Sequence, residues 1–247
     1  WKRAWSVDLE LDENATINTY VNSDHLVVYD QASKERQLRG YGLTDGQRLY
    51  AHGASEFPQG LDTHDLAAIV DAIAPTALIG TSTVHGAFTE GVCKNMAAQC
   101  DRPLIAPISN PTKLAEATAK DVVTWTAGRA LVVTGTPSAS FEYGGQTYHI
   151  GQGNNALMYP GLCLGALIPR SRIVSDGMLL AGASALADMV DLDTPGAAIL
   201  PSMAELPKIT RTVARAVALE SIEEGLNRIE VADVDQAIAD AAWDPRY

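Results

Sequence analysis

Three short apolar stretches decide the fold: Thr76-Ala-Leu-Ile-Gly80, Pro103-Leu-Ile-Ala-Pro-Ile108 and Arg129-Ala-Leu-Val-Val-Thr134. Each is apolar almost throughout, which is typical of strands buried on both faces of a parallel sheet. Helical patterns of about 10–15 residues separate them, and His25-Leu-Val-Val-Tyr-Asp30 has the pattern of a further strand that ends in an acid. This order predicts an α/β fold with a doubly wound parallel sheet, whose ligand lies at the carboxyl ends of the strands.

Residues that accept hydrogen bonds from free N–H groups mark where the intervening helices begin. We expect three such helices: residues 62–73 capped by Asp62 or Thr63, residues 89–100 capped by Thr89, and residues 118–128 opened by the capping box Thr118-Ala-Lys-Asp121.

The character of the chain changes near Asn155. Residues 156–168 are apolar nearly throughout, so we expect them to be buried. Two long amphipathic helices are expected over residues 175–190 and 202–224, the second with a Ser202-x-x-Glu205 capping box. No further strand is expected. The sequence therefore predicts an α/β domain over residues 1–155 and a helical region over residues 156–247.

Composition excludes several classes of protein. The 247 residues are 47% hydrophobic and 19% charged, as expected for a globular chain with a buried core. Lys and Arg number 18 against 30 Asp and Glu, so the net charge of −12 is unlike that of a nucleic-acid-binding surface. No apolar run approaches the ~20 residues of a membrane span, and no signal peptide is evident. Three cysteines without a C-x-x-C pair exclude a disulfide scaffold and are typical of a reducing cytoplasm.

Small or polar residues follow each of the three strands: Thr81-Ser82-Thr83, Ser109-Asn110-Pro111-Thr112 and Gly135-Thr136-Pro137. Taken singly, each cluster is explained by turn and helix-start chemistry, since Asn is a good N-cap and Pro suits the first helical position. Because the carboxyl ends of parallel strands share one edge of the sheet, the three clusters together predict a binding site for a dinucleotide.

Two other places could contact a ligand. Asp30 could bond the ribose hydroxyls of NAD, or it could simply lie solvated in a turn. The glycine-rich turn expected before such an acid is absent, because residues 1–24 contain no glycine. Gly151-Gln-Gly-Asn-Asn155 places two amides in a backbone that can approach a ligand closely. The five histidines and the carboxylates show no spacing typical of a metal or acid/base site.

A set of short motifs also occurs in a fixed order along the chain: Ile79-Gly-Thr-Ser-Thr83, Gly86-Ala-Phe-Thr-Glu90, Arg102-Pro103, Ser109-Asn-Pro-Thr-Lys-Leu-Ala-Glu116, Trp125-Thr-Ala-Gly-Arg129, Gly151-Gln-Gly-Asn-Asn155, Pro160-Gly161 and Trp243-Asp-Pro-Arg-Tyr247. The ordered set resembles the malic enzyme superfamily and, within it, most of all the malolactic branch. The resemblance runs from about Asp30 to the last residue.

The resemblance implies an NAD-binding, Rossmann-like domain over residues 1–155 and a helical region over residues 156–247 that completes the catalytic domain. It implies NAD as cofactor, Mn²⁺ or Mg²⁺ as metal and L-malate as substrate. It also implies a cytoplasmic homodimer or larger homo-oligomer with no nucleic-acid or membrane partner. By motif, the residues that match malate-binding positions are Asn110, Asn154 and Asn155, and those that match cofactor-binding positions are Asp30, Thr81, Ser82, Asn110 and Asn155.

The family's proton-transferring Tyr and Lys and its three metal-ligating carboxylates lie upstream of the glycine-rich turn. We therefore expect no catalytic residue and no metal ligand in this chain. Gln31-Ala-Ser-Lys34 also departs from the Gly-Leu that usually follows the acid in the family. Together these departures predict a polypeptide that is truncated just after the glycine-rich loop and inactive on its own.

Three functions stay open at this point. The intact protein could be a malolactic enzyme, which converts L-malate to L-lactate and CO₂. It could instead be an NAD(P)-dependent malic enzyme, which releases pyruvate. The chain could also be an isolated, non-catalytic nucleotide-binding fragment.

Overall fold

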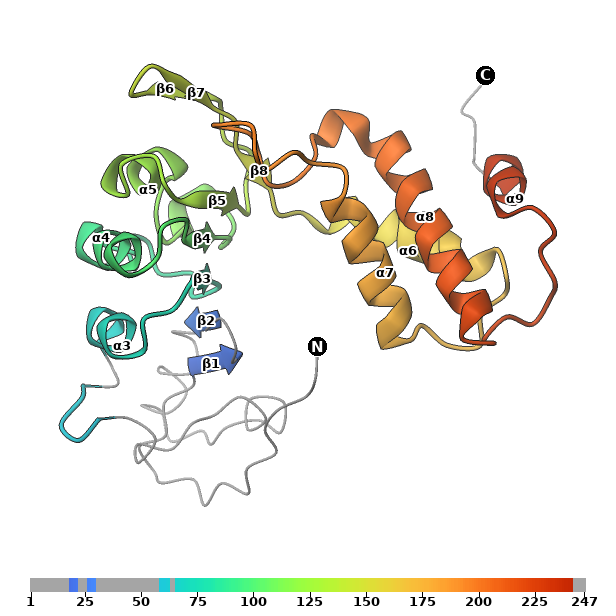
Figure 1. Ribbon diagram of the computed structural model, residues 1–247, viewed down its shortest axis with the longest axis horizontal. Coiled ribbons are helices and arrows are strands. Elements are labelled where there is room, and N and C mark those ends of the chain that lie inside the picture. Colours follow the sequence, from blue (N-terminus) through green and yellow to red (C-terminus); the bar gives the residue numbers. More distant parts are fainter. Residues whose placement is uncertain (1–17, 22–25, 30–57, 63–64, 242–247) are drawn as a thin grey trace. The chain divides into compact units, whose positions relative to one another are not determined.

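The computed structural model describes residues 18–21, 26–29, 58–62 and 65–241, and only the backbone of the first two of these segments (Figure 1). The chain divides into two compact units, Trp1–Ile150 and Gly151–Tyr247. The division comes slightly before the boundary expected near Asn155.

The first unit is built on a predominantly parallel sheet, as predicted. Strands β2 (Leu26–Tyr29), β3 (Ala77–Gly80), β4 (Leu104–Pro107) and β5 (Leu131–Thr134) are parallel neighbours in that order. Their register pairs Tyr29 with Gly80 and Gly80 with Pro107, so the carboxyl ends are level. β1 (Asn18–Val21), which the sequence did not predict, adds to β2 as an antiparallel strand.

Three helices connect these strands: α3 (Leu66–Ile73), α4 (Glu90–Gln99) and α5 (Ala119–Trp125). They lie on one face of the sheet (Figure 1). Parallel strands that follow one another in one direction across a sheet place their connecting helices on the same face when the crossovers are right-handed, as they are in nearly all proteins. The point at which the strand order of a doubly wound sheet reverses therefore does not lie between β2 and β5.

Apolar side chains from the strands and helices form the core of the first unit. Leu78 of β3, Ile105 of β4, Met96 of α4 and Val122 of α5 are fully buried and belong to one cluster. Burying side chains of this size is worth roughly 1.5–3 kcal/mol each, so the cluster is what holds the helices on the sheet.

Two of the three predicted helix starts in this unit are confirmed. The hydroxyl oxygen of Thr89 accepts from the Val92 N–H, and that of Thr118 accepts from the Asp121 N–H at 3.1 Å. The predicted start at Asp62 or Thr63 is wrong. Asp65 is the cap, because its carboxylate accepts from the Ala67 N–H at 2.9 Å while its own N–H closes a turn back to the Asp62 carbonyl.

A hairpin of β6 (Phe141–Tyr143) and β7 (Gln146–Tyr148) follows β5 and was not predicted. Gly144 and Gly145 both have positive φ, at 58° and 79°, as a two-residue turn of type I′ requires. The Gly-Gly pair that directly follows Tyr143 was the signal for it. Tyr148 stacks on Phe141 and donates from its hydroxyl to the Gly128 carbonyl at 3.2 Å, which holds the hairpin on the end of α5.

The second unit is helical after the two-residue strand β8 (Gly151–Gln152). Its helices are α6 (Tyr159–Leu167), α7 (Asp176–Ala187), α8 (Leu206–Glu223) and α9 (Val234–Ala241). Ile209, Val213 and Val217 of α8 are fully buried at the centre of this unit's core.

Two expectations for the second unit need correction. Residues 156–168 are not buried throughout, because α6 buries only the side that faces α8; Tyr159 is 55% and Leu167 71% exposed. The Ser202 hydroxyl does accept from a free N–H, that of Ala204, but it caps the 3₁₀ turn η4 (Met203–Glu205). The α-helix itself begins afterwards, at Leu206.

Candidate functional site

The polar clusters that follow β3, β4 and β5 are joined by hydrogen bonds into one surface, here called the rim: residues 81–83, 109–112 and 135–137. The Thr83 N–H donates to the Ser109 hydroxyl oxygen at 2.9 Å. The Thr112 hydroxyl donates to the Thr136 hydroxyl oxygen at 3.0 Å. The structure thus brings the three loops together at the carboxyl edge of the sheet, where α/β proteins bind their ligands.

A buried carboxylate, that of Glu116, lies beneath the rim. Its side chain is fully buried. Oε1 accepts from the N–H and the hydroxyl of Ser82, both at 2.8 Å, and from the Ser109 hydroxyl. Oε2 accepts from the Ser109 N–H at 3.3 Å. One side chain therefore ties the loop after β3 to the loop after β4.

Gly80 provides the space for this carboxylate. A Cβ atom on Gly80 would lie 2.5 Å from Cδ of Glu116, far inside van der Waals contact. Glu116 was predicted only as the last letter of a motif, without a role. Gly80 at the end of the strand and the serines Ser82 and Ser109 were the only signs of this role in the sequence. Neither sign shows that these residues contact Glu116.

Asn110 is the most available amide of the rim. It is exposed, and its side chain makes no hydrogen bond to any other described residue. The alternative that Asn110 caps a helix is wrong, because Pro111 occupies the N-cap position of the 3₁₀ turn η2 (Thr112–Leu114), which has no side-chain cap. Both the donor and the acceptor of this amide are left for a ligand.

Thr81 and Ser82 differ sharply although they are adjacent. Thr81 is exposed at the edge of the sheet, whereas Ser82 is 2% exposed and its hydroxyl is engaged by Glu116 and by the Val84 N–H. Thr81 can therefore contact a ligand directly, while Ser82 shapes the loop from below.

Asn154 and Asn155 belong to the second unit. Oδ1 of Asn154 accepts from the Ala156 N–H at 2.9 Å and so caps the 3₁₀ turn η3 (Asn155–Leu157). Its NH₂ group is not used by that cap. Asn155 is exposed in the first position of the turn.

Comparison with known proteins decides the family. The chain matches the family model described as "Malic enzyme, NAD binding domain" over residues 14–222. The chain belongs to the malic enzyme family. It spans 38% of the length of the malolactic enzyme of Lactiplantibacillus plantarum, with 48% identity over 83% of this chain. It likewise spans 37% of NAD-dependent malic enzyme 3 of Bacillus subtilis, with 47% identity over 83% of this chain.

Solved malic enzymes share the fold. The malic enzyme of Entamoeba histolytica aligns with 91% of this chain and 40% of its own, with a TM-score of 0.59 and 24% identity. The malic enzyme of Pyrococcus horikoshii aligns with 90% of this chain and 45% of its own, with a TM-score of 0.57 and 21% identity. The α/β fold predicted from the strand pattern, and the Rossmann-like domain that the resemblance implied, are thereby confirmed.

Other predicted contacts of this malic enzyme family member stay predictions. Asp30 and the closing motif Trp243–Tyr247 lie outside the described residues. Among the residues that are described, no three His, Cys, Asp or Glu side chains lie together as metal ligands would, so they do not fit Mn²⁺ or Mg²⁺. Nor does any described helix have the length and apolarity needed to cross a membrane.

The described thiols differ in exposure. Burial, together with the nearby Asp121 carboxylate as the smaller cause, raises the pKa of the Cys93 thiol to about 12. Cys163 is exposed. Cys93 therefore stays protonated and unreactive at neutral pH.

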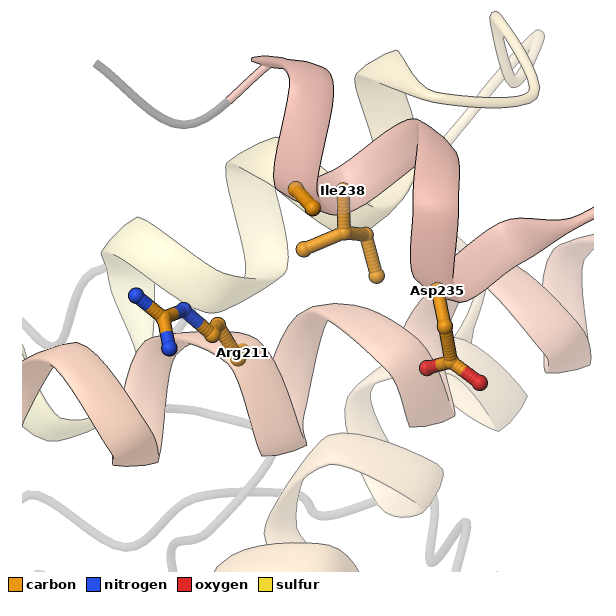
Figure 2. A pocket seen from close by; sticks show the side chains of 4 residues that line it. Arg211, Asp235 and Ile238 are labelled. Atoms are coloured by element: carbon orange, nitrogen blue, oxygen red, sulfur yellow. The ribbon is translucent and has the colours of Figure 1, made fainter. Parts of the chain in front are cut away.

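The second unit carries a hollow of about 370 Å³, lined by Arg211, Asp235, Ile238 and Ala239 (Figure 2). Ile238 separates the Arg211 guanidinium from the Asp235 carboxylate in this view, and that carboxylate already pairs with Arg215 at 3.0 Å. None of the predicted site residues lines this hollow, so we place the candidate site at the rim.

Proposed function

We propose that this chain is the NAD-binding and C-terminal part of a malolactic enzyme, which converts L-malate to L-lactate and CO₂. The observation that carries the proposal is the rim: a polar edge with a free amide, Asn110, in a chain that belongs to the malic enzyme family. A dinucleotide needs neutral donors and acceptors at the carboxyl edge of the sheet, and the rim supplies them.

The residues of the rim have distinct parts in this proposal. Thr81 and Asn110 contact the cofactor, and Asn110 also donates to a malate carboxylate, as do Asn154 and Asn155 of the second unit. Ser82 holds the loop that carries Thr81. NAD, when bound, supplies the hydride acceptor. Mn²⁺ or Mg²⁺ is proposed for the whole enzyme, with ligands and proton-transferring groups outside this chain.

Cofactor choice is proposed to depend on Asp30. A carboxylate at the ribose position favours NAD and repels the 2′-phosphate of NADP. Replacing Asp30→Ser in the full-length enzyme should relax the preference, measured as the ratio of kcat/KM for the two cofactors. Equal values for NAD and NADP in the wild type would contradict this role of Asp30.

The second candidate function is an NAD-dependent malic enzyme that releases pyruvate and NADH. It is favoured by the Bacillus subtilis relative, whose 47% identity equals that of the malolactic enzymes within a few per cent. Product analysis separates the two. Purified full-length enzyme with L-malate, NAD and Mn²⁺ should form lactate without net NADH, whereas pyruvate with an equal amount of NADH would support the second candidate.

A non-catalytic role is tested in the same assay. The isolated 247-residue chain is expected to show no turnover of malate at any Mn²⁺ concentration, because proton transfer and metal binding are assigned to groups outside it. If the full-length protein also fails to turn over malate, the chain would be better explained as part of a non-catalytic nucleotide-binding module. A cytoplasmic homodimer or larger homo-oligomer is also proposed for the full-length enzyme.

A further inference from the structure

Glu116 is buried where a charged group is costly, yet it is not paired to a base in the hydrogen bonds that hold it. All four bonds come from neutral donors: the N–H groups and hydroxyls of Ser82 and Ser109. A carboxylate is removed from water at considerable free-energy cost unless its lone pairs are satisfied in this way. An apolar side chain could fill the same volume without that cost. The carboxylate is therefore expected to contribute something other than packing.

The carboxylate of Glu116 acts through the rim residues that adjoin the two serines. Ser82 directly follows Thr81, and Ser109 directly precedes Asn110; both Thr81 and Asn110 have exposed polar side chains. Fixing the two serines to one carboxylate therefore fixes the spacing between Thr81 and Asn110. The Thr83 N–H, which donates to the Ser109 hydroxyl oxygen, adds a direct cross-link between the same loops.

The backbone around Glu116 strengthens this arrangement. The carbonyl of Glu116 accepts from the Phe88 N–H at 3.1 Å, and Phe88 is fully buried in the core. The preceding carbonyl, that of Ala115, lies 3.1 Å from Nδ1 of His85. The carboxylate is thus held from below by the core while it orients the loops above.

We propose that Glu116 is a positioning residue that sets the distance between the two loops that grip the cofactor. The proposal rests on the proposed function, since it assigns NAD to the rim. Glu116 does not touch NAD itself, because its side chain is fully buried. Its acceptor oxygens hold Thr81 and Asn110 at the separation that a bound dinucleotide spans.

The test is Glu116→Gln in the full-length enzyme. The amide keeps the shape of the side chain but turns one acceptor oxygen into a donor, which must then face an N–H or hydroxyl donor of a serine. We expect the dissociation constant for NAD, measured by calorimetry without malate, to rise about 10- to 100-fold, since small misplacements of binding groups cost this much. In the absence of NAD, the backbone amides of residues 81–83, 109, 110 and 112 should exchange hydrogen faster in this variant than in wild type.

A matched control separates positioning from loss of stability. Thr126 is also buried, and its hydroxyl donates to the Val122 carbonyl at 2.7 Å and accepts from the Ala130 N–H, away from the carboxyl ends of the strands. Thr126→Val should lower the melting temperature while NAD affinity stays within about twofold of wild type. If Glu116→Gln weakens NAD binding no more than Thr126→Val does, Glu116 is structural only and the proposal is overturned.

Ser109→Ala keeps the proposal testable if Glu116→Gln fails to fold. It removes one donor to Glu116 and the acceptor for the Thr83 N–H, so NAD affinity should fall about fivefold or more. Unchanged NAD affinity in this variant would also overturn the proposal. Wild-type enzyme that binds NAD but does not turn over malate would contradict the proposed function and leave the role of Glu116 supported by the binding data.

Discussion

The two asparagine segments of this chain look alike in sequence but are built differently. Asn110 precedes a Pro and a 3₁₀ turn, and Asn154 precedes another 3₁₀ turn. The side-chain oxygen of Asn154 caps the turn that follows it, whereas the turn after Asn110 has no side-chain cap. Asn154 therefore has a local structural role in the second unit. Among the described residues, none depends in this way on the side chain of Asn110.

The surroundings explain the difference. Around Asn110 the loops are held by longer-range bonds to Glu116, so the turn does not depend on an asparagine cap. The segment around Asn154 uses its own side chain to start the turn before α6. A polar residue that a fold does not need locally is a stronger candidate for ligand binding than one that also stabilises its own turn.

The largest expected effect comes from Asn110→Asp in the full-length enzyme. The carboxylate loses the amide donor and places a negative charge beside a dianionic substrate, which should cost ~2–4 kcal/mol of transition-state binding. We expect kcat/KM for malate to fall roughly 30- to 1000-fold at an unchanged melting temperature. Asn95→Asp on α4 adds the same charge elsewhere in the unit and should change kcat/KM less than about threefold. Turnover of Asn110→Asp within about threefold of wild type would remove Asn110 from the site.

Two glycine variants compare the units directly. A Cβ on Gly80 would meet Glu116, and a Cβ on Gly165 of α6 would lie 2.5 Å from the Ala214 carbonyl oxygen of α8. Either alanine should lower the free energy of unfolding by about 1–3 kcal/mol, measured by denaturant titration. Only Gly80→Ala should also weaken NAD binding, because only it displaces the carboxylate under the rim. If Gly80→Ala and Gly165→Ala weakened NAD binding equally, the loss of affinity would be explained by lower stability and not by displacement of the Glu116 carboxylate.

Local signals predicted much of the fold. Thr89 and Thr118 were each recognised as caps, and each accepts from the N–H three residues on. The strands were recognised from continuous apolar runs, because a strand that is buried on both faces of a sheet is apolar along its whole length. The hairpin was missed although its Gly-Gly turn was visible, because its strands are only three residues long.

What the sequence could not predict depends on contacts between distant residues. Glu116 meets Ser82 across 34 positions of the chain, and no local pattern marks that meeting. The exposure of Leu167 is a similar case: residues 156–168 are apolar on every side of the helix, so composition alone could not show which side α8 covers. The three rim loops were predicted as a group because parallel topology places strand ends together, without knowledge of their partners.

An intermediate effect is expected at Asn154, where cap and site can be separated. Asn154→Ala removes the acceptor for the Ala156 N–H and should cost about 1 kcal/mol of stability. Asn154→Asp keeps the acceptor, so its unfolding free energy should match wild type within a few tenths of a kcal/mol. If the NH₂ group binds malate, as proposed, Asn154→Asp should still lose about tenfold in kcat/KM. Full activity in Asn154→Asp would leave Asn154 as a cap alone.

The smallest effect is expected from Gly91→Ala, which tests whether function in the first unit is confined to the rim. Gly91 lies in the first turn of α4, and a Cβ there would find only the Thr89 hydroxyl oxygen, at 3.8 Å. Alanine should therefore stabilise the protein by about 0.5–1 kcal/mol, since it restricts the unfolded chain without a clash.

Gly86, in the same motif, is the control for that variant. A Cβ on Gly86 would have open space, but its φ of +74° disfavours any side chain, so Gly86→Ala should destabilise by about 1 kcal/mol. Both variants should leave NAD affinity and kcat/KM within about twofold of wild type, because neither residue bonds to Glu116 or belongs to the rim. A marked loss of NAD affinity in Gly91→Ala, with stability raised as expected, would show that the cofactor site extends beyond the rim to the start of α4.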